Sequence, residues 1–111
     1  MTQWIDIAAL VDIPRQGARV VKTAQGCVAV FRTLDDHVFA LEDRCPHKGG
    51  PLSEGIVHGH KVTCPLHNWV FDMNTGEAQG ADNGQVGTFT AKVEAGRIYL
   101  DATQLMARSA A

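Results

Sequence analysis

Two short motifs in the middle of the chain, C-x-H and C-x-x-H, constrain its fold more than any other feature. Cys45 and His47 form the first motif, and Cys64 and His67 form the second. A proline follows each of these cysteines, which is typical of stiff, exposed loops rather than of strand interiors. The fold must therefore hold two rigid loops, each with one thiolate and one imidazole, against each other.

The four side chains together are the ligand set of a 2Fe-2S cluster that has two cysteines on one iron and two histidines on the other. Ferredoxin-type clusters use four cysteines, and this chain has only 3. A tetrahedral zinc site uses the same donors, but zinc fingers usually pair Cys with Cys and His with His along the sequence. The alternation within each loop favours the cluster. Two alternatives remain. The four side chains could bind zinc, or the cysteines could lie in the core and the histidines on the surface without binding a metal.

Under the cluster hypothesis, Cys45 and Cys64 bind the inner iron, and His47 and His67 bind the outer iron. Neutral imidazoles in place of thiolates lower the negative charge of the cluster, so an added electron is better tolerated. The histidine-bound iron is therefore the reducible one, and loop tips would place it near a partner protein.

Short strands separated by turn residues predict an all-β chain. Strands are expected at residues 4–7, 19–22, 27–32, 38–42, 61–63, 69–71, 89–93 and 97–100, with turns at 34–36, 58–60, 74–76 and 95–96. This spacing is typical of an antiparallel sandwich or barrel. The third cysteine, Cys27, lies in an apolar strand, and we expect it to be a small buried hydrophobe.

Two further sets of residues invite a choice between structural and functional roles. His58 and His60 flank Gly59, which predicts a hairpin turn with solvent-facing histidines rather than metal ligands. Trp69 and Phe71 follow the second motif with alternating spacing, and we expect them to pack the core and shield the cluster.

The segment 44–84 resembles the cluster-binding region of Rieske proteins. The chain from Trp4 to Leu100 also resembles the small subunits of assimilatory NAD(P)H nitrite reductases, through the segment 49–55, Asn68-Trp69 and Gly80-Ala81-Asp82. This resemblance implies one Rieske domain over residues 1–111, an antiparallel β-sandwich with an inserted cluster-binding subdomain. The base subdomain would comprise about 1–42 and 85–102, and the cluster-binding subdomain about 43–84.

The same resemblance implies a one-electron relay in nitrate assimilation. A large subunit with flavin, sirohaem and a 4Fe-4S cluster would reduce nitrite to ammonium, and this chain would be its electron-transfer subunit. The chain has no nucleophile-and-base constellation and no phosphate-cradling glycine-rich motif, so we expect it to be inactive alone. The alternative is a free Rieske ferredoxin that feeds a ring-hydroxylating dioxygenase or is shared by nitrate and nitrite reductases.

Length and charge agree with a carrier that needs partners. A chain of 111 residues is too small to hold a flavin, a nicotinamide site and a substrate site besides a cluster. The formal charge of -2, without a basic patch, argues against nucleic-acid binding. The sequence has neither an apolar run that could span a membrane nor a signal-like N-terminus, so we expect a cytoplasmic protein without membrane contact.

Overall fold

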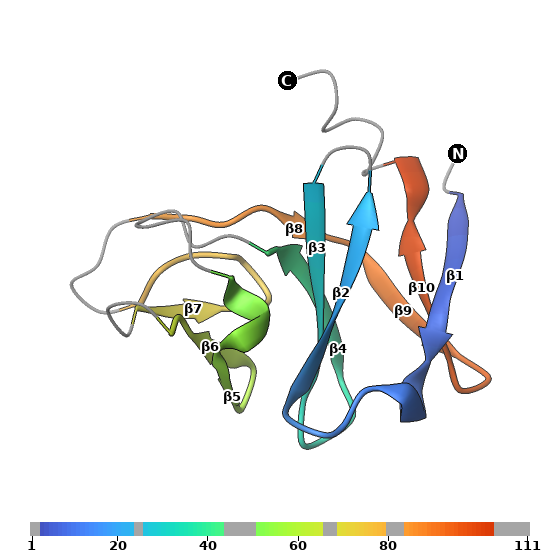
Figure 1. Cartoon of the computed structure of the whole chain (residues 1–111), viewed down its shortest axis with the longest axis horizontal. Coiled ribbons are helices and arrows are strands. Elements are labelled where there is room, and N and C mark those ends of the chain that lie inside the picture. The colour runs from blue at the N-terminus through green and yellow to red at the C-terminus, as the bar shows by residue number, and fades with distance from the viewer. Residues whose placement is uncertain (1–2, 24–25, 44–50, 66–68, 80–83, 104–111) are drawn as a thin grey trace.

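Antiparallel β-structure dominates the chain, as the sequence predicts (Figure 1). The computed structural model describes residues 3–23, 26–43, 51–65, 69–79 and 84–103. With η for a 3₁₀ turn, the elements are β1 (Trp4–Ala9), η1 (Leu10–Asp12), β2 (Gly17–Thr23), β3 (Gly26–Arg32), β4 (Val38–Glu42), η2 (Leu52–Glu54), β5 (Ile56–His58), β6 (Lys61–Thr63), β7 (Val70–Asp72), β8 (Thr88–Phe89), β9 (Ala91–Glu94) and β10 (Arg97–Asp101).

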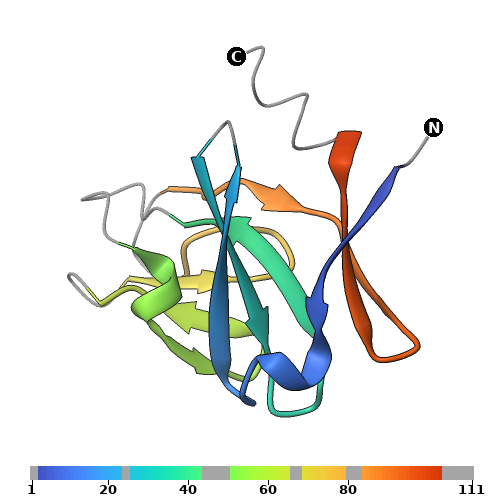
Figure 2. The ribbon, with the colours of Figure 1, turned by 45° about the vertical axis from the view of Figure 1, so that its right-hand side comes forward.

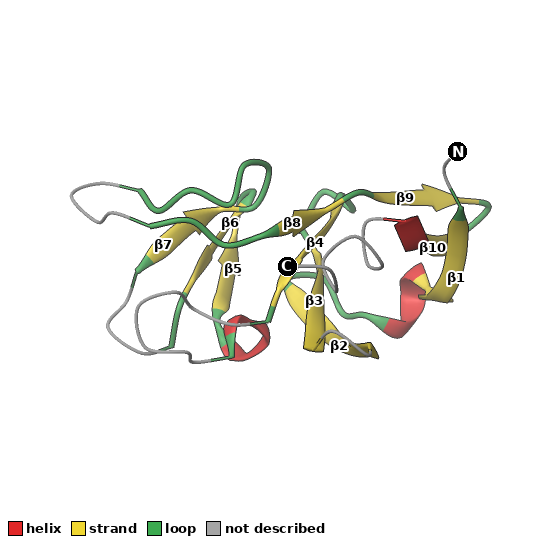
Figure 3. Ribbon diagram, turned by 90° about the horizontal axis from the view of Figure 1, so that it is seen from above, coloured by secondary structure: helices red, strands yellow, loops and turns green. Residues whose placement is uncertain are grey.

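The strands form three sheets. The central sheet has the order β2-β3-β4-β8, and two three-stranded sheets have the orders β1-β10-β9 and β5-β6-β7. Figures 1 and 3 show these two smaller sheets on opposite sides of the central sheet, and Figure 2 shows the twist of the long central strands. Neighbouring strands in each sheet are antiparallel.

The central strand β3 is covered on both faces, which explains its continuous apolar run. Its alternating side chains enter two different cores. We call the core beside β1-β10-β9 the scaffold core, whose buried residues are Ile13, Val28, Val30, Ala40, Ile98 and Leu100. The motif core lies beside β5-β6-β7, and its buried residues are Ala29, Phe31, Leu41, Leu52, Val57, Val62, Cys64, Phe71, Met73 and Val86.

One predicted strand is divided in the structure. The sequence predicts a single strand over 89–93, but β8 pairs with β4 of the central sheet and β9 pairs with β10 of another sheet. Only Thr90 separates the two strands. The chain therefore passes from one sheet to the next at this residue, a change that residue alternation does not reveal.

The expectation for Cys27 was wrong, because its side chain is exposed. The residue lies near the start of β3, opposite Lys22 and close to the end of the hairpin. Burial on both faces begins only at Val28, where the flanking sheets cover the strand. The apolar pattern of a strand does not show at which residue burial begins, so it could not reveal that Cys27 lies beyond the core.

Some predictions lie outside what the described residues test. The division into a base subdomain, about 1–42 and 85–102, and a cluster-binding subdomain, about 43–84, stays a prediction. The Gly80-Ala81-Asp82 segment lies outside the described residues. Among those that are described, no helical segment has the length and hydrophobicity needed to cross a lipid bilayer.

Candidate functional site

The described part of the second motif is Cys64, which follows β6 directly. Its side chain is 1% exposed and packs in the motif core. The Cys64 backbone N–H donates a hydrogen bond to the Trp69 carbonyl oxygen at 2.6 Å. This bond joins the two ends of the loop that carries His67, which itself lies outside the described residues.

The ends of the first motif loop are also joined. Asp43 precedes this loop and Ser53 follows it; Cys45 and His47, between them, lie outside the described residues. The Ser53 backbone N–H donates to Asp43 Oδ1 at 2.7 Å, and the Ser53 hydroxyl donates to Asp43 Oδ2 at 2.9 Å. Both motif loops are therefore closed at their bases by hydrogen bonds.

A close backbone contact brings the two loop bases together. A Cβ atom on Gly55, just after η2, would lie 2.3 Å from the Thr63 carbonyl oxygen and 3.0 Å from that of Leu52. Thr63 is the residue immediately before Cys64, and Leu52 is fully buried in the motif core. Glycine at position 55 thus permits the end of the first loop to lie against the start of the second.

Apolar side chains surround the base of the second loop. Trp69 is partly buried against the motif core, and its ring centroid lies 6.2 Å from that of the fully buried Phe71. The predicted packing of these two aromatic residues is confirmed. Their role in shielding a cluster stays a prediction.

The surroundings of Cys64 fit a ligand of an iron–sulfur cluster. A thiolate is costly to bury among apolar side chains without a compensating charge, and metal coordination supplies that charge. Cys64 is not part of a disulfide. The donor set in the two motifs, two thiolates and two imidazoles, matches the Rieske arrangement. The burial of Cys64 and the joined ends of both loops are compatible with this cofactor, and the assignment of the four ligands stays a prediction.

One histidine outside the motifs has a role that the sequence did not reveal. The hairpin around Gly59 is confirmed, and His58 is exposed beside the Thr63 hydroxyl. The His60 side chain is 36% exposed, in line with the solvent-facing prediction, but it also turns toward Asp35, with 3.1 Å between its Nε2 and Asp35 Oδ2. The two residues lie in turns that belong to different sheets, 25 positions apart, so no local pattern links them.

The family follows from comparison with known proteins. The model of the Rieske [2Fe-2S] domain matches residues 3–90, and the chain belongs to this family. It is 32% identical to the ferredoxin component of a naphthalene 1,2-dioxygenase system from Pseudomonas aeruginosa, over 89% of this chain and 95% of that protein.

Two solved structures share the fold along most of both chains. One is a complex of reduced oxygenase and oxidised ferredoxin in carbazole 1,9a-dioxygenase, with a TM-score of 0.78, 29% identity and coverage of 88% of this chain and 92% of that one. The other is described as a putative NADH-dependent nitrite reductase small subunit from Mycobacterium tuberculosis, with a TM-score of 0.80, 26% identity and coverage of 90% and 95%.

These findings establish the fold, the cofactor and the general function. The chain has the all-β Rieske fold, its cofactor is a Rieske 2Fe-2S cluster, and it transfers electrons in association with oxidoreductases.

Proposed function

We propose that this chain is the ferredoxin component of an oxygenase system and passes single electrons to a separate oxygenase. The observation that carries this proposal is the match to a dioxygenase ferredoxin over 95% of that protein, at 32% identity. A solved ferredoxin in complex with its oxygenase supports it, at 29% identity. From the sequence alone, this role is the alternative to that of a nitrite reductase small subunit.

In this role, Cys45 and Cys64 would bind one iron of the cluster, and His47 and His67 would bind the other. When bound, the cluster accepts and releases one electron. The Asp43–Ser53 hydrogen bonds and the Cys64–Trp69 bond fix the ends of the two loops that carry the candidate ligands. Burial of Cys64 keeps water from the sulfur that it offers.

The second candidate is the small subunit of an NAD(P)H-dependent nitrite reductase, with a large sirohaem and flavin subunit as partner. The nitrite reductase structure from Mycobacterium tuberculosis supports it, with 26% identity over 90% of this chain. Asn68-Trp69 and Gly80-Ala81-Asp82 support it as well. In either role we expect the chain alone to turn over neither nitrite nor an aromatic substrate.

Affinity co-purification distinguishes the two candidates. The tagged chain, with its cluster, is expressed in its native cells, which grow either on nitrate or on an aromatic carbon source. Retained proteins are identified by mass spectrometry and absorption spectra, and each is then mixed with the reduced chain in a stopped-flow experiment. The Cys64→Ser chain is the matched control, because it should present the same fold without the cluster.

We expect a mononuclear-iron oxygenase that reoxidises the reduced chain and works only when the cluster is present. A sirohaem flavoprotein with cluster-dependent nitrite reduction would overturn this proposal in favour of the second candidate. Retention of neither enzyme, by a chain with an intact cluster, would overturn both.

A further inference from the structure

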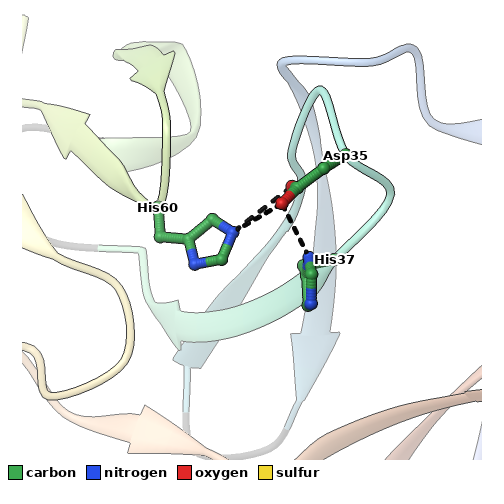
Figure 4. A group of neighbouring side chains, drawn as sticks. All are labelled: Asp35, His37 and His60. Atoms are coloured by element: carbon green, nitrogen blue, oxygen red, sulfur yellow. Dashed lines mark hydrogen bonds and ion pairs between the residues drawn. The ribbon is translucent and has the colours of Figure 1, made fainter.

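Two histidines and one carboxylate converge between the β3–β4 turn and the β5–β6 turn (Figure 4). His37 Nδ1 lies 3.1 Å from Asp35 Oδ2, and His60 Nε2 lies 3.1 Å from the same oxygen. The three potential ligand atoms all lie within 4.8 Å of one another. The arrangement thus has one carboxylate oxygen facing two imidazole nitrogens.

Asp35 and His37 are held by the structure of their turn. Thr33 is fully buried, and its hydroxyl donates a hydrogen bond to Asp35 Oδ1. The same hydroxyl oxygen accepts from the His37 backbone N–H at 2.9 Å, and the Thr33 N–H donates to the His37 carbonyl oxygen at 2.9 Å. These bonds orient the carboxylate, as partners of metal ligands commonly do.

His60 is placed by its hairpin and by a neighbouring strand. Gly59 takes a φ of 58°, a left-handed conformation that suits glycine in a tight turn. The His60 carbonyl oxygen accepts a hydrogen bond from the Met73 N–H at 2.9 Å. The His60 ring lies against Phe39, with 5.2 Å between centroids, and 4.7 Å from the centroid of His37.

The simplest account of this group is a surface hydrogen-bond bridge without a metal. The hydrogen bonds from the Thr33 hydroxyl and then from His60 and His37 hold the pKa of Asp35 well below its usual range, so its carboxylate is ionised at neutral pH. That bridge already sets two of the three spacings that a metal needs. Ligand atoms about 2.0–2.1 Å from a tetrahedral zinc ion are about 3.3 Å from each other. Each imidazole nitrogen lies 3.1 Å from Asp35 Oδ2, and the two nitrogens lie within 4.8 Å of each other.

We propose that Asp35, His37 and His60 form a zinc-binding site that is separate from the cluster. The ligands are Asp35 Oδ2, His37 Nδ1 and His60 Nε2. Both imidazole nitrogens now aim at the carboxylate oxygen, so the two rings must turn toward a common point to close around one ion. Water completes the tetrahedral shell, as in zinc sites with three protein ligands. A pocket lined by Gln16, Leu34, Asp35, Gly59 and His60 provides solvent access.

Bound zinc would join two sheets of the molecule. Asp35 and His37 belong to the turn that ends β3 in the central sheet, whereas His60 belongs to the hairpin of β5 and β6. A ligand that binds only the folded chain raises its stability by mass action. Zinc would therefore stabilise the packing of the β5-β6-β7 sheet against the central sheet. Strand β6 of that smaller sheet leads directly into Cys64.

Zinc titration of the purified protein with its intact cluster tests the proposal. Isothermal titration calorimetry with zinc chloride, followed by metal analysis, should show one zinc per chain in the wild type. Asp35→Asn and His60→Ala should each weaken binding by about tenfold or more, since each removes one ligand. His58→Ala is the matched control on the same hairpin and should bind zinc as the wild type does.

Two further readouts separate this site from the cluster ligands and from a general loss of structure. The visible absorption of the cluster should stay constant during the titration, and zinc should raise the unfolding temperature of the wild type and of His58→Ala but not of Asp35→Asn. The Asp35→Asn change keeps the side chain's shape, so it tests the site even if His60→Ala folds poorly. Absence of zinc binding, unchanged binding in Asp35→Asn, or bleaching of the cluster in step with zinc uptake would overturn the proposal.

Discussion

The two cores on either side of the central sheet differ in composition and in what they support. The scaffold core is built from aliphatic side chains of β3, β4 and β10 and Ile13. The motif core adds the aromatic residues Phe31 and Phe71, and it contains Cys64. The two cores share the strands β3 and β4, since Ala40 of β4 lies in the scaffold core and Leu41 in the motif core, yet the two cores differ in what they support. One stabilises the fold, and the other also positions Cys64, one of the candidate cluster ligands.

The largest expected effect is a difference in cluster content between serine variants of the buried Cys64 and the exposed Cys27. Cys64→Ser should abolish cluster assembly, because a serine hydroxyl replaces the thiolate ligand. Cys27→Ser should keep the full spectrum, since Cys27 is exposed at the start of β3. Iron and sulfide content, visible absorption and electron paramagnetic resonance of the reduced protein provide the measurement. A full cluster in Cys64→Ser would remove this residue from the ligand set.

Large-to-small substitutions in each core come next. Phe71→Ala in the motif core should lower the free energy of unfolding by about 3–5 kcal/mol, and Ile98→Ala in the scaffold core by about 2–5 kcal/mol. Both side chains are fully buried. Only Phe71→Ala should also speed iron release, because Phe71 packs against Trp69 at the second loop.

Urea unfolding followed by circular dichroism measures the stability of both variants, and the transfer of iron to a chelator measures release. Equal release rates in variants of matched stability would show that the two cores are not functionally distinct.

Glycine substitutions should give a smaller but still selective effect. Gly55→Ala places a methyl group 2.3 Å from the Thr63 carbonyl oxygen, so the backbone must move beside Cys64. Gly96→Ala, between β9 and β10, meets no atom within 4 Å and has only the strain of its φ of +76°, about 1–2 kcal/mol. We expect Gly55→Ala to cost more stability and to lower the iron content.

Gly96→Ala is the control, since it should lose stability alone. Thermal unfolding measures the loss of stability in both purified variants, and iron analysis measures their cluster content. A normal iron content in Gly55→Ala would argue against the role of this contact in positioning the second loop.

The smallest effect is expected from an exposed ion pair on the scaffold side. Arg97 of β10 donates to both carboxylate oxygens of Asp6 in β1. Its Nη2 donates to Oδ1 at 2.7 Å, and its Nε is shared between Oδ2 at 3.0 Å and Oδ1 at 3.2 Å. The hydrogen bond from Arg97 lowers the pKa of Asp6 below its ordinary value of 3.8. The pair therefore stabilises the fold above that ordinary value, and this stabilisation is lost as pH falls through the lowered pKa.

Asp6→Asn should accordingly lower the urea midpoint slightly at neutral pH and leave the cluster spectrum unchanged. The difference from the wild type should shrink as the pH falls below the ordinary carboxyl range and as salt is added. Parallel urea titrations of the two chains across this pH range test the expectation. A difference that grows on acidification would contradict the assigned sign.

Much of the β-structure was predictable because its signals are local. The segment 27–32 has the apolar run of a buried strand, and β3 spans Gly26–Arg32. Turn residues at 58–60 and 95–96 predicted two hairpin connections, which Gly59 and Gly96 make with positive φ angles. The spacing of the two motifs likewise predicted the cluster ligands, and this assignment stays a prediction.

Other features depend on which strands meet. The division of segment 89–93 at Thr90, the exposure of Cys27, and the contact of His60 with Asp35 each involve partners that are distant in the sequence. Alternation within one strand cannot show which sheet it joins or where a covering sheet ends. Gly55 illustrates the same point, since only the approach of the Thr63 backbone explains why a side chain does not fit there.

By itself, the sequence determined the chemical type of the site and the class of the fold. The two C-x-H and C-x-x-H motifs specify two thiolates and two imidazoles, and short alternating segments specify β-strands, because both signals lie within a few residues. The tertiary structure alone decided that three sheets stack with a shared central layer and that Cys64 is buried. It also decided that the β3–β4 and β5–β6 turns meet. These outcomes follow from packing between distant segments, whose free energy no local pattern contains.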